Sequence, residues 1–345
     1  MKEKLINASL FVATIIFTLL ALEIGLRAYH GEWEFTNFRF PQANKFVGYH
    51  TYDAELGWVP EPQQATVWGK TVTILEDGIR SNGGREVKDG TEDPILAVGD
   101  SYTFGDQVAD SDTWPAQLDQ RSGKRVVNGG VDGYGVDQTF LRAQRLLNRY
   151  RFSTVIFSFI PDDIRRSQMS VMFATAKPYF DFKGGQLTLE NVPVPPPSFL
   201  PQKESPLLIA VEHSRLVDAV MKRVSPEWWL RGASETQAQD QERAIEVACA
   251  LLHKLEELTK SRGSELIVLA QHWEFEPASE SLESERVLRC VADPATRVLD
   301  LKPALSALKA RDPARYRQLY NPFRHMSAEG NQFVARELLP MLAER

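Results

Sequence analysis

Five short apolar runs, each followed by a stretch with helical periodicity, place the strongest constraint on how this chain folds. The runs lie at residues 95–98, 125–127, 154–160, 265–270 and 297–301. None of them alternates polar with apolar residues, which is typical of strands buried on both faces of a parallel sheet. The helical stretches lie at residues 113–121, 136–149, 241–260, 303–309 and 328–343. This alternation predicts an α/β fold with a five-stranded parallel sheet and right-handed crossovers.

The composition is that of a globular chain. Of 345 residues, 43% are hydrophobic and 25% are charged, which excludes wholesale disorder. The net charge is −6, and no long basic run is present, so we expect no nucleic-acid partner. Two cysteines, Cys249 and Cys290, are too few for a disulfide scaffold or a four-cysteine zinc site. The sequence leaves open whether they form one disulfide or stay two buried thiols.

Residues 5–26 form an apolar segment with a single charge, Glu23. At about 1.5 Å per residue it spans about 33 Å, enough for a hydrocarbon core of roughly 30 Å. Lys2 and Lys4 precede it, so the positive-inside rule predicts a cytoplasmic N-terminus and the rest of the chain outside. A cleaved signal peptide and a buried soluble helix are the alternatives. The length of the apolar core and the poor cleavage site at residues 21–23 favour a bilayer anchor.

The chain divides into three parts by composition. Residues 1–28 are the predicted membrane anchor, residues 29–93 a juxtamembrane region with short strands near 64–75, and residues 94–345 the α/β domain. An insertion at about 165–238 interrupts the strand–helix rhythm of that domain. Within it, the turn at residues 183–186 predicts a hairpin that joins 179–182 to 187–190.

Three groups of residues point to chemistry at one end of the predicted sheet, because ligands of open α/β sheets bind at the carboxyl ends of the strands. Ser101 follows the first strand in a tight turn, which would expose its hydroxyl and offer its backbone N–H to an oxyanion. Asn128 opens a glycine-rich turn that contains Gly133. His325 precedes the last helix and is a candidate general base. Taken singly, each is better explained without a function, as a capping serine, a flexible turn and a structural histidine.

Taken together, these groups resemble the SGNH hydrolases, the GDSL family of esterases and lipases. The run Gly99-Asp100-Ser101-Tyr102 is similar to the first block of that family, Asn128 with Gly133 to the second, and His325 to the last. The resemblance covers about residues 93–345 and implies a three-layer α/β/α sandwich. It implies that Ser101 is the nucleophile and His325 the base, without a metal or organic cofactor. The backbone N–H groups of Ser101 and Gly133 would hold the oxyanion, and Asp100 and Asn128 would support these turns.

Two positions depart from the family pattern. Asp162 stands where the third block usually has an asparagine that donates to the oxyanion. An ionised Asp162 would repel the oxyanion and a protonated one would donate to it; a third interpretation is that it orients His325. Pro322 stands where the last block usually has the aspartate of the triad. Asn321 or a backbone carbonyl is therefore another candidate for orienting the imidazole.

The resemblance implies a serine esterase or O-acyltransferase that acts on acyl esters. Its anchor would hold it in a bacterial inner membrane, with the catalytic domain in the periplasm. Anchored members of the family include O-acetyltransferases of exported polysaccharides, so acylated glycan is the expected substrate class and an export or acetylation machinery an expected partner. The alternative is a catalytically impaired SGNH-fold module that binds acylated glycan. The sequence leaves the acyl group, the acceptor and the oligomeric state open.

Overall fold

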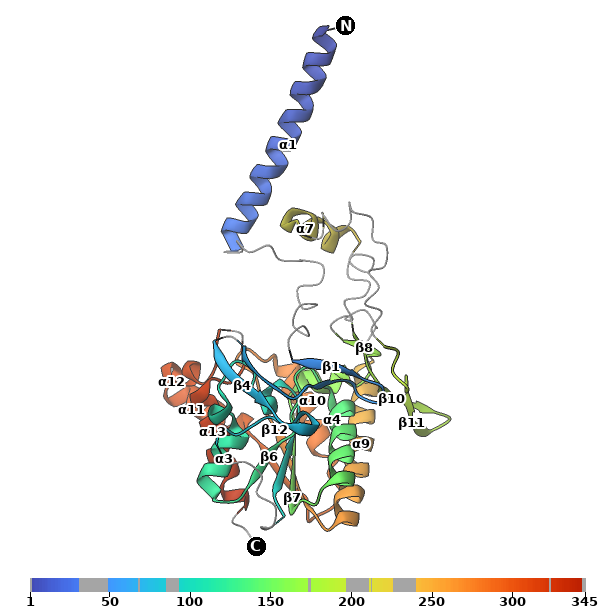
Figure 1. The fold of residues 1–345 in the computed structure, drawn as a ribbon, viewed down its shortest axis with the longest axis vertical. Coiled ribbons are helices and arrows are strands. Elements are labelled where there is room, and N and C mark those ends of the chain that lie inside the picture. The colour runs from blue at the N-terminus through green and yellow to red at the C-terminus, as the bar shows by residue number, and fades with distance from the viewer. Residues whose placement is uncertain are drawn as a thin grey trace. The chain divides into compact units, whose positions relative to one another are not determined.

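The computed structural model describes residues 2–30, 49–67, 69–84, 93–172, 175–196, 211, 213–225, 240–322 and 324–342 (Figure 1). The chain forms two compact units. Residues 1–47, 171–175 and 197–237 make up the first unit, and residues 48–170, 176–196 and 238–345 make up the second.

The second unit is built on a five-stranded sheet with the strand order β13-β12-β7-β5-β6. Every neighbouring pair in this sheet is parallel. The strands are β5 (Ile95–Val98), β6 (Val126–Asn128), β7 (Thr154–Phe159), β12 (Glu265–Ala270) and β13 (Arg297–Asp300). They coincide closely with the five apolar runs of the sequence, so the predicted α/β fold with a parallel sheet is confirmed.

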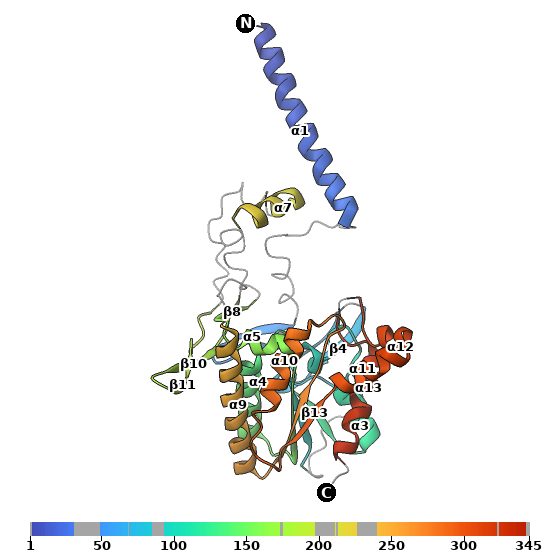
Figure 2. The same cartoon turned by 180° about the vertical axis from the view of Figure 1, so that it is seen from behind.

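Helices cover both faces of this sheet (Figures 1 and 2). One face carries α4 (Val136–Arg149), α5 (Pro161–Arg166), α9 (Gln241–Arg262) and α10 (Ala278–Leu288). The other carries α3 (Trp114–Ser122), α11 (Lys302–Arg311), α12 (Pro313–Gln318) and α13 (Ala328–Leu338). Successive strand residues alternate between the two cores: Leu96 and Val98 pack into the first, Ile95 and Ala97 into the second. The result is the predicted three-layer α/β/α sandwich.

The segment that precedes β5 is part of the same unit. It forms two antiparallel hairpins, β1 (His50–Asp53) with β2 (Gly57–Pro60) and β3 (Gln63–Val67) with β4 (Lys70–Ile74), followed by the 3₁₀ turn η1 (Glu76–Gly78). Arg80 then forms an antiparallel bridge with Asn128 at the end of β6. Residues 49–84 therefore extend the edge of the α/β unit. The rest of the predicted juxtamembrane region, at 31–48 and 85–92, lies outside the described residues, as does Trp68.

The predicted insertion is shared between the two units. It contains the short strands β8 (Val171–Met172) and β9 (Thr175–Ala176) and the hairpin of β10 (Tyr179–Lys183) with β11 (Gln186–Glu190). Gly184 and Gly185 form the hairpin turn with φ angles of 57° and 80°, a backbone region that favours glycine. Residues 176–196 belong to the α/β unit. Residues 173–174, 197–210, 212 and 226–239 lie outside the described part of the chain.

The first unit contains α1 (Lys2–His30) and α7 (Arg215–Val224). The apolar part of α1, Ser9–Tyr29, is long enough to cross a membrane, a property that signal sequences share. Near its C-terminal end, the Glu23 carboxylate accepts hydrogen bonds from Ser214 Oγ at 2.8 Å and from the backbone N–H groups of Arg215 and Leu216 at 2.9 and 2.8 Å. Glu23 therefore caps the N-terminus of α7, which explains a charge in an otherwise apolar segment.

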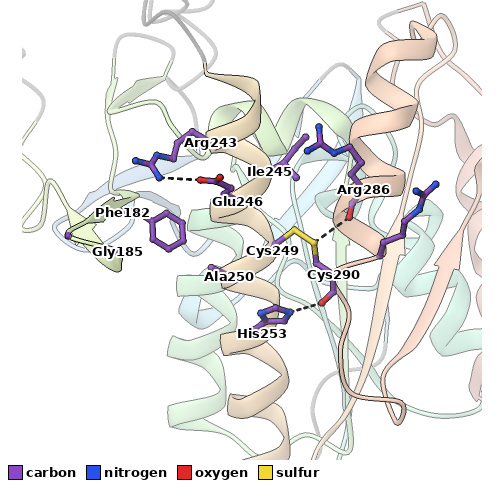
Figure 3. Close-up of a pocket in the computed structure, with 12 residues that line it drawn as sticks. Phe182, Gly185, Arg243, Ile245, Glu246, Cys249, Ala250, His253, Arg286 and Cys290 are labelled. Carbon is purple, nitrogen blue, oxygen red and sulfur yellow. Dashed lines mark hydrogen bonds and ion pairs between the residues drawn. A yellow bond between two sulfur atoms is a disulfide. The ribbon is translucent and has the colours of Figure 1, made fainter.

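The two cysteines form a disulfide that joins α9 to the end of α10. Cys249 lies in α9 and Cys290 just after α10, with their Cα atoms 5.4 Å apart (Figure 3). His253 Nε2 lies 2.6 Å from the Cys290 carbonyl oxygen, next to the disulfide. The structure thus resolves the alternative that the sequence left open.

A pocket of about 780 Å³ lies over this disulfide (Figure 3). Two of the arginines that line it are paired with glutamates: Arg243 with Glu246, and Arg286 with Glu242. The pocket contains neither Ser101 nor His325, so the candidate chemistry lies elsewhere on the unit.

Candidate active site

Ser101 begins the short helix α2 (Ser101–Phe104), directly after β5. A Cβ atom at Gly99 would lie 2.2 Å from Thr103 Oγ1 and 2.8 Å from the Ser158 carbonyl oxygen, so only glycine allows this close turn. Asp100 caps α2 by accepting a hydrogen bond from the Tyr102 N–H at 2.9 Å. Because Ser101 lies in the first turn of α2, its backbone N–H has no intrahelical acceptor.

His325 lies at the end of a tight loop that precedes α13. The Asn321 N–H donates to the His325 carbonyl oxygen at 2.9 Å, and Asn321 Oδ1 accepts from the His325 N–H at 3.3 Å. Tyr320 and Met326 form a bridge at the base of the loop. The loop brings His325 Nε2 to 3.0 Å from Ser101 Oγ, so the two residues that the sequence singled out are within hydrogen-bond distance.

The unit thus combines a five-stranded parallel sheet with a serine turn after β5 and a histidine before α13. This is the strand and helix arrangement that the sequence resemblance to the SGNH hydrolases implied. The structure brings Ser101 and His325 together, and their roles as nucleophile and base remain predictions.

No protein-family model matches this chain, and no curated protein matches it. Among solved structures, it is similar to a lipolytic protein of the G-D-S-L family from Desulfitobacterium hafniense DCB-2, at 16% identity and a TM-score of 0.39, over 72% of this chain and 99% of that one. It is also similar to TesA, at 14% identity and a TM-score of 0.41, over 72% and 97% of the two chains. A family two carbohydrate esterase from Clostridium thermocellum is similar at 9% identity and a TM-score of 0.40, over 75% and 66%. These similarities concern the fold and identify no substrate of this chain.

The glycine-rich turn after β6 packs against the serine turn after β5. The Gly129 N–H donates to the Ala97 carbonyl oxygen at 2.8 Å, and the Val131 N–H donates to that of Gly99 at 3.0 Å. Asn128 is fully buried, and its Oδ1 accepts from the Gly130 N–H at 3.1 Å. Asn128 therefore shapes the turn from within, and its support of catalysis remains a prediction.

Gly133 lies further along the same turn. Its φ of 77° is in the left-handed region, which explains why glycine occupies this position. Its neighbour Asp132 accepts a hydrogen bond from His50 Nε2 at 2.7 Å, and the Asp132 carbonyl oxygen accepts from Trp58 Nε1 at 3.2 Å. Strands β1 and β2 thus hold the turn in place. That Gly133 donates to an oxyanion remains a prediction.

Two buried carboxylates and one partly buried guanidinium lie near Ser101. Arg166 Nη1 lies 3.5 Å from Asp100 Oδ2 and 2.6 Å from Asp163 Oδ1, and both aspartates are fully buried. Burial raises the pKa of Asp100, although Arg166 opposes this. Burial and the nearby Asp100 charge raise the pKa of Asp163 well above its usual value. Asp100 Oδ2 also lies 3.3 Å from Ser101 Oγ, so it is a second acceptor near the hydroxyl.

Asp162 lies at the start of α5 and takes part in two ion pairs. Its carboxylate pairs with Arg165, and its Oδ2 lies 3.7 Å from Arg166 Nη2. Its side chain is 35% exposed. Ion pairs stabilise the ionised form of a carboxylate, which accepts hydrogen bonds but donates none. Its sequence-based roles as an oxyanion donor or as the group that orients His325 remain predictions, and the ion pairs do not favour the first.

Asp106 is a candidate site residue that the sequence reasoning missed. Its Oδ2 lies 4.0 Å from His325 Nε2, and its side chain is 12% exposed. The Asp106 N–H donates to the Ser101 carbonyl oxygen at 3.0 Å, which fixes the loop after α2. The only sign of it in the sequence was an acidic residue shortly after the serine. Whether the Asp106 side chain points toward His325 depends on how the loop after α2 folds.

Arg80 organises that same loop and was also missed. It is almost completely buried, and it donates to the carbonyl oxygens of Phe104 at 2.7 Å and Val108 at 2.6 Å. Its Nε lies 3.3 Å from Asp110, in the 3₁₀ turn η2 (Asp110–Asp112). The guanidinium also lies over the Phe104 ring, 4.7 Å from its centroid. Arg80 thus connects the N-terminal hairpins to the loop that carries Asp106.

A buried histidine supports the His325 loop from the other side. His272 follows β12, with its Nδ1 2.8 Å from Glu276 Oε1 and its Nε2 2.7 Å from Asp300 Oδ1. Burial lowers the pKa of His272, but the hydrogen bonds to Asp300 and Glu276 outweigh burial and raise it above its usual value. Lys302 Nζ also lies 3.4 Å from Glu276. The His272 carbonyl oxygen accepts from Tyr320 Oη at 3.0 Å, at the base of the His325 loop.

The first prediction concerns Asp106. Asp106→Asn removes a negative charge 4.0 Å from the imidazole, so the imidazolium that forms during proton transfer is less stable. We expect kcat/KM for p-nitrophenyl acetate to fall about 10-fold, the effect of one partly screened charge pair. The acid limb of the rate profile should move to lower pH. Glu257→Gln, at an exposed position on α9, is the matched control. An unchanged rate and profile would show that Asp106 plays no part.

The second prediction concerns His272 and pH. Because the pKa of His272 is raised in the folded protein, its stabilising contribution is complete below the unfolded value of about 6.5 and is lost as pH rises through the folded value. The free energy of unfolding should therefore differ more between the wild type and His272→Gln at pH 6 than at pH 9. Urea unfolding measures both values, with His253→Gln as the control at an exposed histidine. An equal difference at the two pH values would contradict a charged His272.

Proposed function

We propose that this chain is an extracytoplasmic, membrane-anchored serine esterase or O-acyltransferase that acts on acyl esters, with acylated glycan as its substrate class. The observation that carries the proposal is the 3.0 Å distance between Ser101 Oγ and His325 Nε2 at the carboxyl end of β5. A serine paired with a histidine at the ligand-binding end of a parallel sheet is the arrangement of an activated nucleophile.

In the proposed mechanism, His325 Nε2 accepts the Ser101 proton while Oγ attacks the ester carbonyl carbon. The backbone N–H groups of Ser101 and Gly133 hold the oxyanion of the tetrahedral intermediate. The Asp106 carboxylate stabilises the imidazolium, which then gives its proton to the departing alkoxide. Water completes a hydrolysis by attacking the acyl-enzyme, with His325 again as base; a glycan hydroxyl in place of water completes a transfer.

Two features support a location outside the cytoplasm. Lys2 and Lys4 precede the apolar part of α1, which favours a cytoplasmic N-terminus. The Cys249–Cys290 disulfide is typical of an oxidising compartment such as the periplasm. With this orientation, the enzyme faces exported polysaccharide at the inner membrane, and an export or acetylation machinery is the partner that this location implies.

A non-catalytic module that binds acylated glycan is the second candidate. It is supported by the ion pairs of Asp162, which occupies the place of an oxyanion donor, and by Pro322 in place of the usual triad aspartate. Such a module would keep the fold and the cleft for the ester but would not form an acyl-enzyme.

The third prediction tests the nucleophile. The full-length protein in detergent should react with a fluorophosphonate probe and cleave p-nitrophenyl acetate. Ser101→Ala should abolish labelling and lower kcat by at least about 10³-fold, because no other group replaces the attacking oxygen. Ser111→Ala, at an exposed serine, is the matched control. Binding of acylated glycan by a wild-type protein that the probe does not label would favour the non-catalytic module.

The fourth prediction tests the orientation. Alkaline phosphatase, which is active only outside the cytoplasm, should be active when fused after Arg345. The matched fusion to green fluorescent protein should be dark. Green fluorescent protein that the general secretory route carries across the membrane does not fluoresce, because it becomes fluorescent only when it folds in the cytoplasm. The reverse pattern would overturn the proposed location.

A further inference from the structure

Two aromatic rings and one guanidinium form a surface beside the candidate active site. The guanidinium carbon of Arg324 lies 5.4 Å from the centroid of the Trp273 ring and 5.9 Å from that of the Phe275 ring. Arg324 is exposed, and Phe275 is 63% exposed, which is high for a phenylalanine in an ordered segment. We call these three residues the Arg324 platform.

The platform adjoins the reacting groups. Arg324 directly precedes His325, and its carbonyl oxygen accepts a hydrogen bond from Tyr102 Oη at 2.6 Å. Tyr102 directly follows Ser101, and its ring centroid lies 5.4 Å from that of His325. Arg324 has a φ of 70°, a strained conformation for an arginine. Strain of this kind persists where the surrounding contacts fix it, and it often marks a functional position.

The aromatic side of the platform is held from several directions. Trp273 Nε1 donates to Glu280 Oε2 at 3.1 Å, and Arg165 Nη1 donates to Glu280 Oε1 at 3.1 Å. The carbonyl oxygen of Glu274 accepts from Tyr316 Oη at 3.0 Å. The segment that presents Phe275 to solvent is therefore fixed, and ligand binding there would need little further ordering.

The rings contact the guanidinium without using its hydrogen-bond donors. A guanidinium bound to aromatic rings keeps its N–H groups available for a planar acceptor such as a carboxylate. In the described part of the chain, no residue accepts a hydrogen bond from the Arg324 guanidinium. Arg324 is thus held by the two rings near the candidate nucleophile Ser101, and the exposed Phe275 ring lies next to it.

We propose that the Arg324 platform binds a carboxylate of an acidic glycan, with a sugar ring packed on Phe275, and so presents an O-acyl ester of that glycan to Ser101. The inference rests on the proposed function and narrows its substrate class to acylated glycans that carry uronate residues. A bidentate arginine–carboxylate pair adds geometric selectivity as well as affinity. Neutral acylated glycans would gain only the ring contact.

Two polymers that differ in whether their carboxylates are free or methyl-esterified test this inference. Acetylated polygalacturonate carries free carboxylates, and its methyl ester has the same backbone and acetyl groups but no charge. The full-length protein in detergent should release acetate with a kcat/KM about 10- to 100-fold higher for the free acid, as expected for one charged hydrogen-bonded pair. The measured quantity is the ratio of the two kcat/KM values.

Arg324→Asn should reduce this ratio to about one, because asparagine tolerates a positive φ but provides no charge. Arg324→Lys should give an intermediate ratio. The control is Arg121→Asn, which should leave the ratio unchanged, because Arg121 lies at the C-terminal end of α3, just before β6 begins. Damage to the neighbouring His325 would lower both rates together and would not change the ratio. A ratio near one in the wild type, or a ratio that Arg324→Asn preserves, would overturn the proposal.

Failure of the proposed function gives a different result. A protein that cleaves neither p-nitrophenyl acetate nor either polymer has no esterase activity, and the platform is then tested by binding alone. Calorimetric titration should show tighter binding of the free-acid polymer than of its methyl ester to the wild type and equal binding to Arg324→Asn. Equal binding of both polymers to the wild type would overturn the platform independently of catalysis.

Discussion

One partly buried guanidinium connects three of the segments that form the candidate site. Arg166 pairs with Asp100 from the serine turn and with Asp163 from the third block, and its Nη1 lies 3.4 Å from the carbonyl oxygen of Tyr134 in the second. Removing this guanidinium would take away the positive charge that opposes the raised pKa of each buried aspartate. The position of Ser101 depends on this cluster because Asp100 caps α2.

The same burial sets the proton chemistry next to Ser101. The Ser101 hydroxyl has a single proton and two acceptors, His325 Nε2 at 3.0 Å and Asp100 Oδ2 at 3.3 Å. Asp100 already accepts from the Tyr102 N–H and pairs with Arg166. These partners hold the Asp100 carboxylate where it caps α2. The shorter hydrogen bond, from Ser101 Oγ to His325 Nε2, is therefore the proposed route by which the hydroxyl proton leaves. The cluster therefore stabilises the turn without replacing the candidate base.

The sequence predicted the parts of this arrangement that depend on local pattern. Apolar runs without alternation identified all five strands of the sheet, and glycine at the end of β5 identified the serine turn. Arg80, Asp106 and His272 could not be assigned from sequence, because their roles depend on partners from distant segments. Arginine is mostly found at the surface, so nothing in the sequence indicated that Arg80 is buried. This is why residues 49–84, which Arg80 connects to the sheet, looked like a separate region.

Pro322 stands where the SGNH pattern has the aspartate of a triad, so other groups around His325 would have to perform its two tasks. An aspartate in a triad both orients the imidazole and stabilises its charged form. Asp106 lies on the Nε2 side of the ring, beside Ser101, so it can stabilise the charge but does not take the usual orienting position. The loop backbone around His325 is held by two hydrogen bonds with Asn321 and by the Tyr102 bond to the Arg324 carbonyl oxygen, and the Tyr102 ring lies beside the imidazole. The His272 cluster supports the base of this loop through the Tyr320 hydrogen bond to the His272 carbonyl oxygen. If different residues orient the imidazole and stabilise its charge, no aspartate is needed at position 322, where this chain has proline.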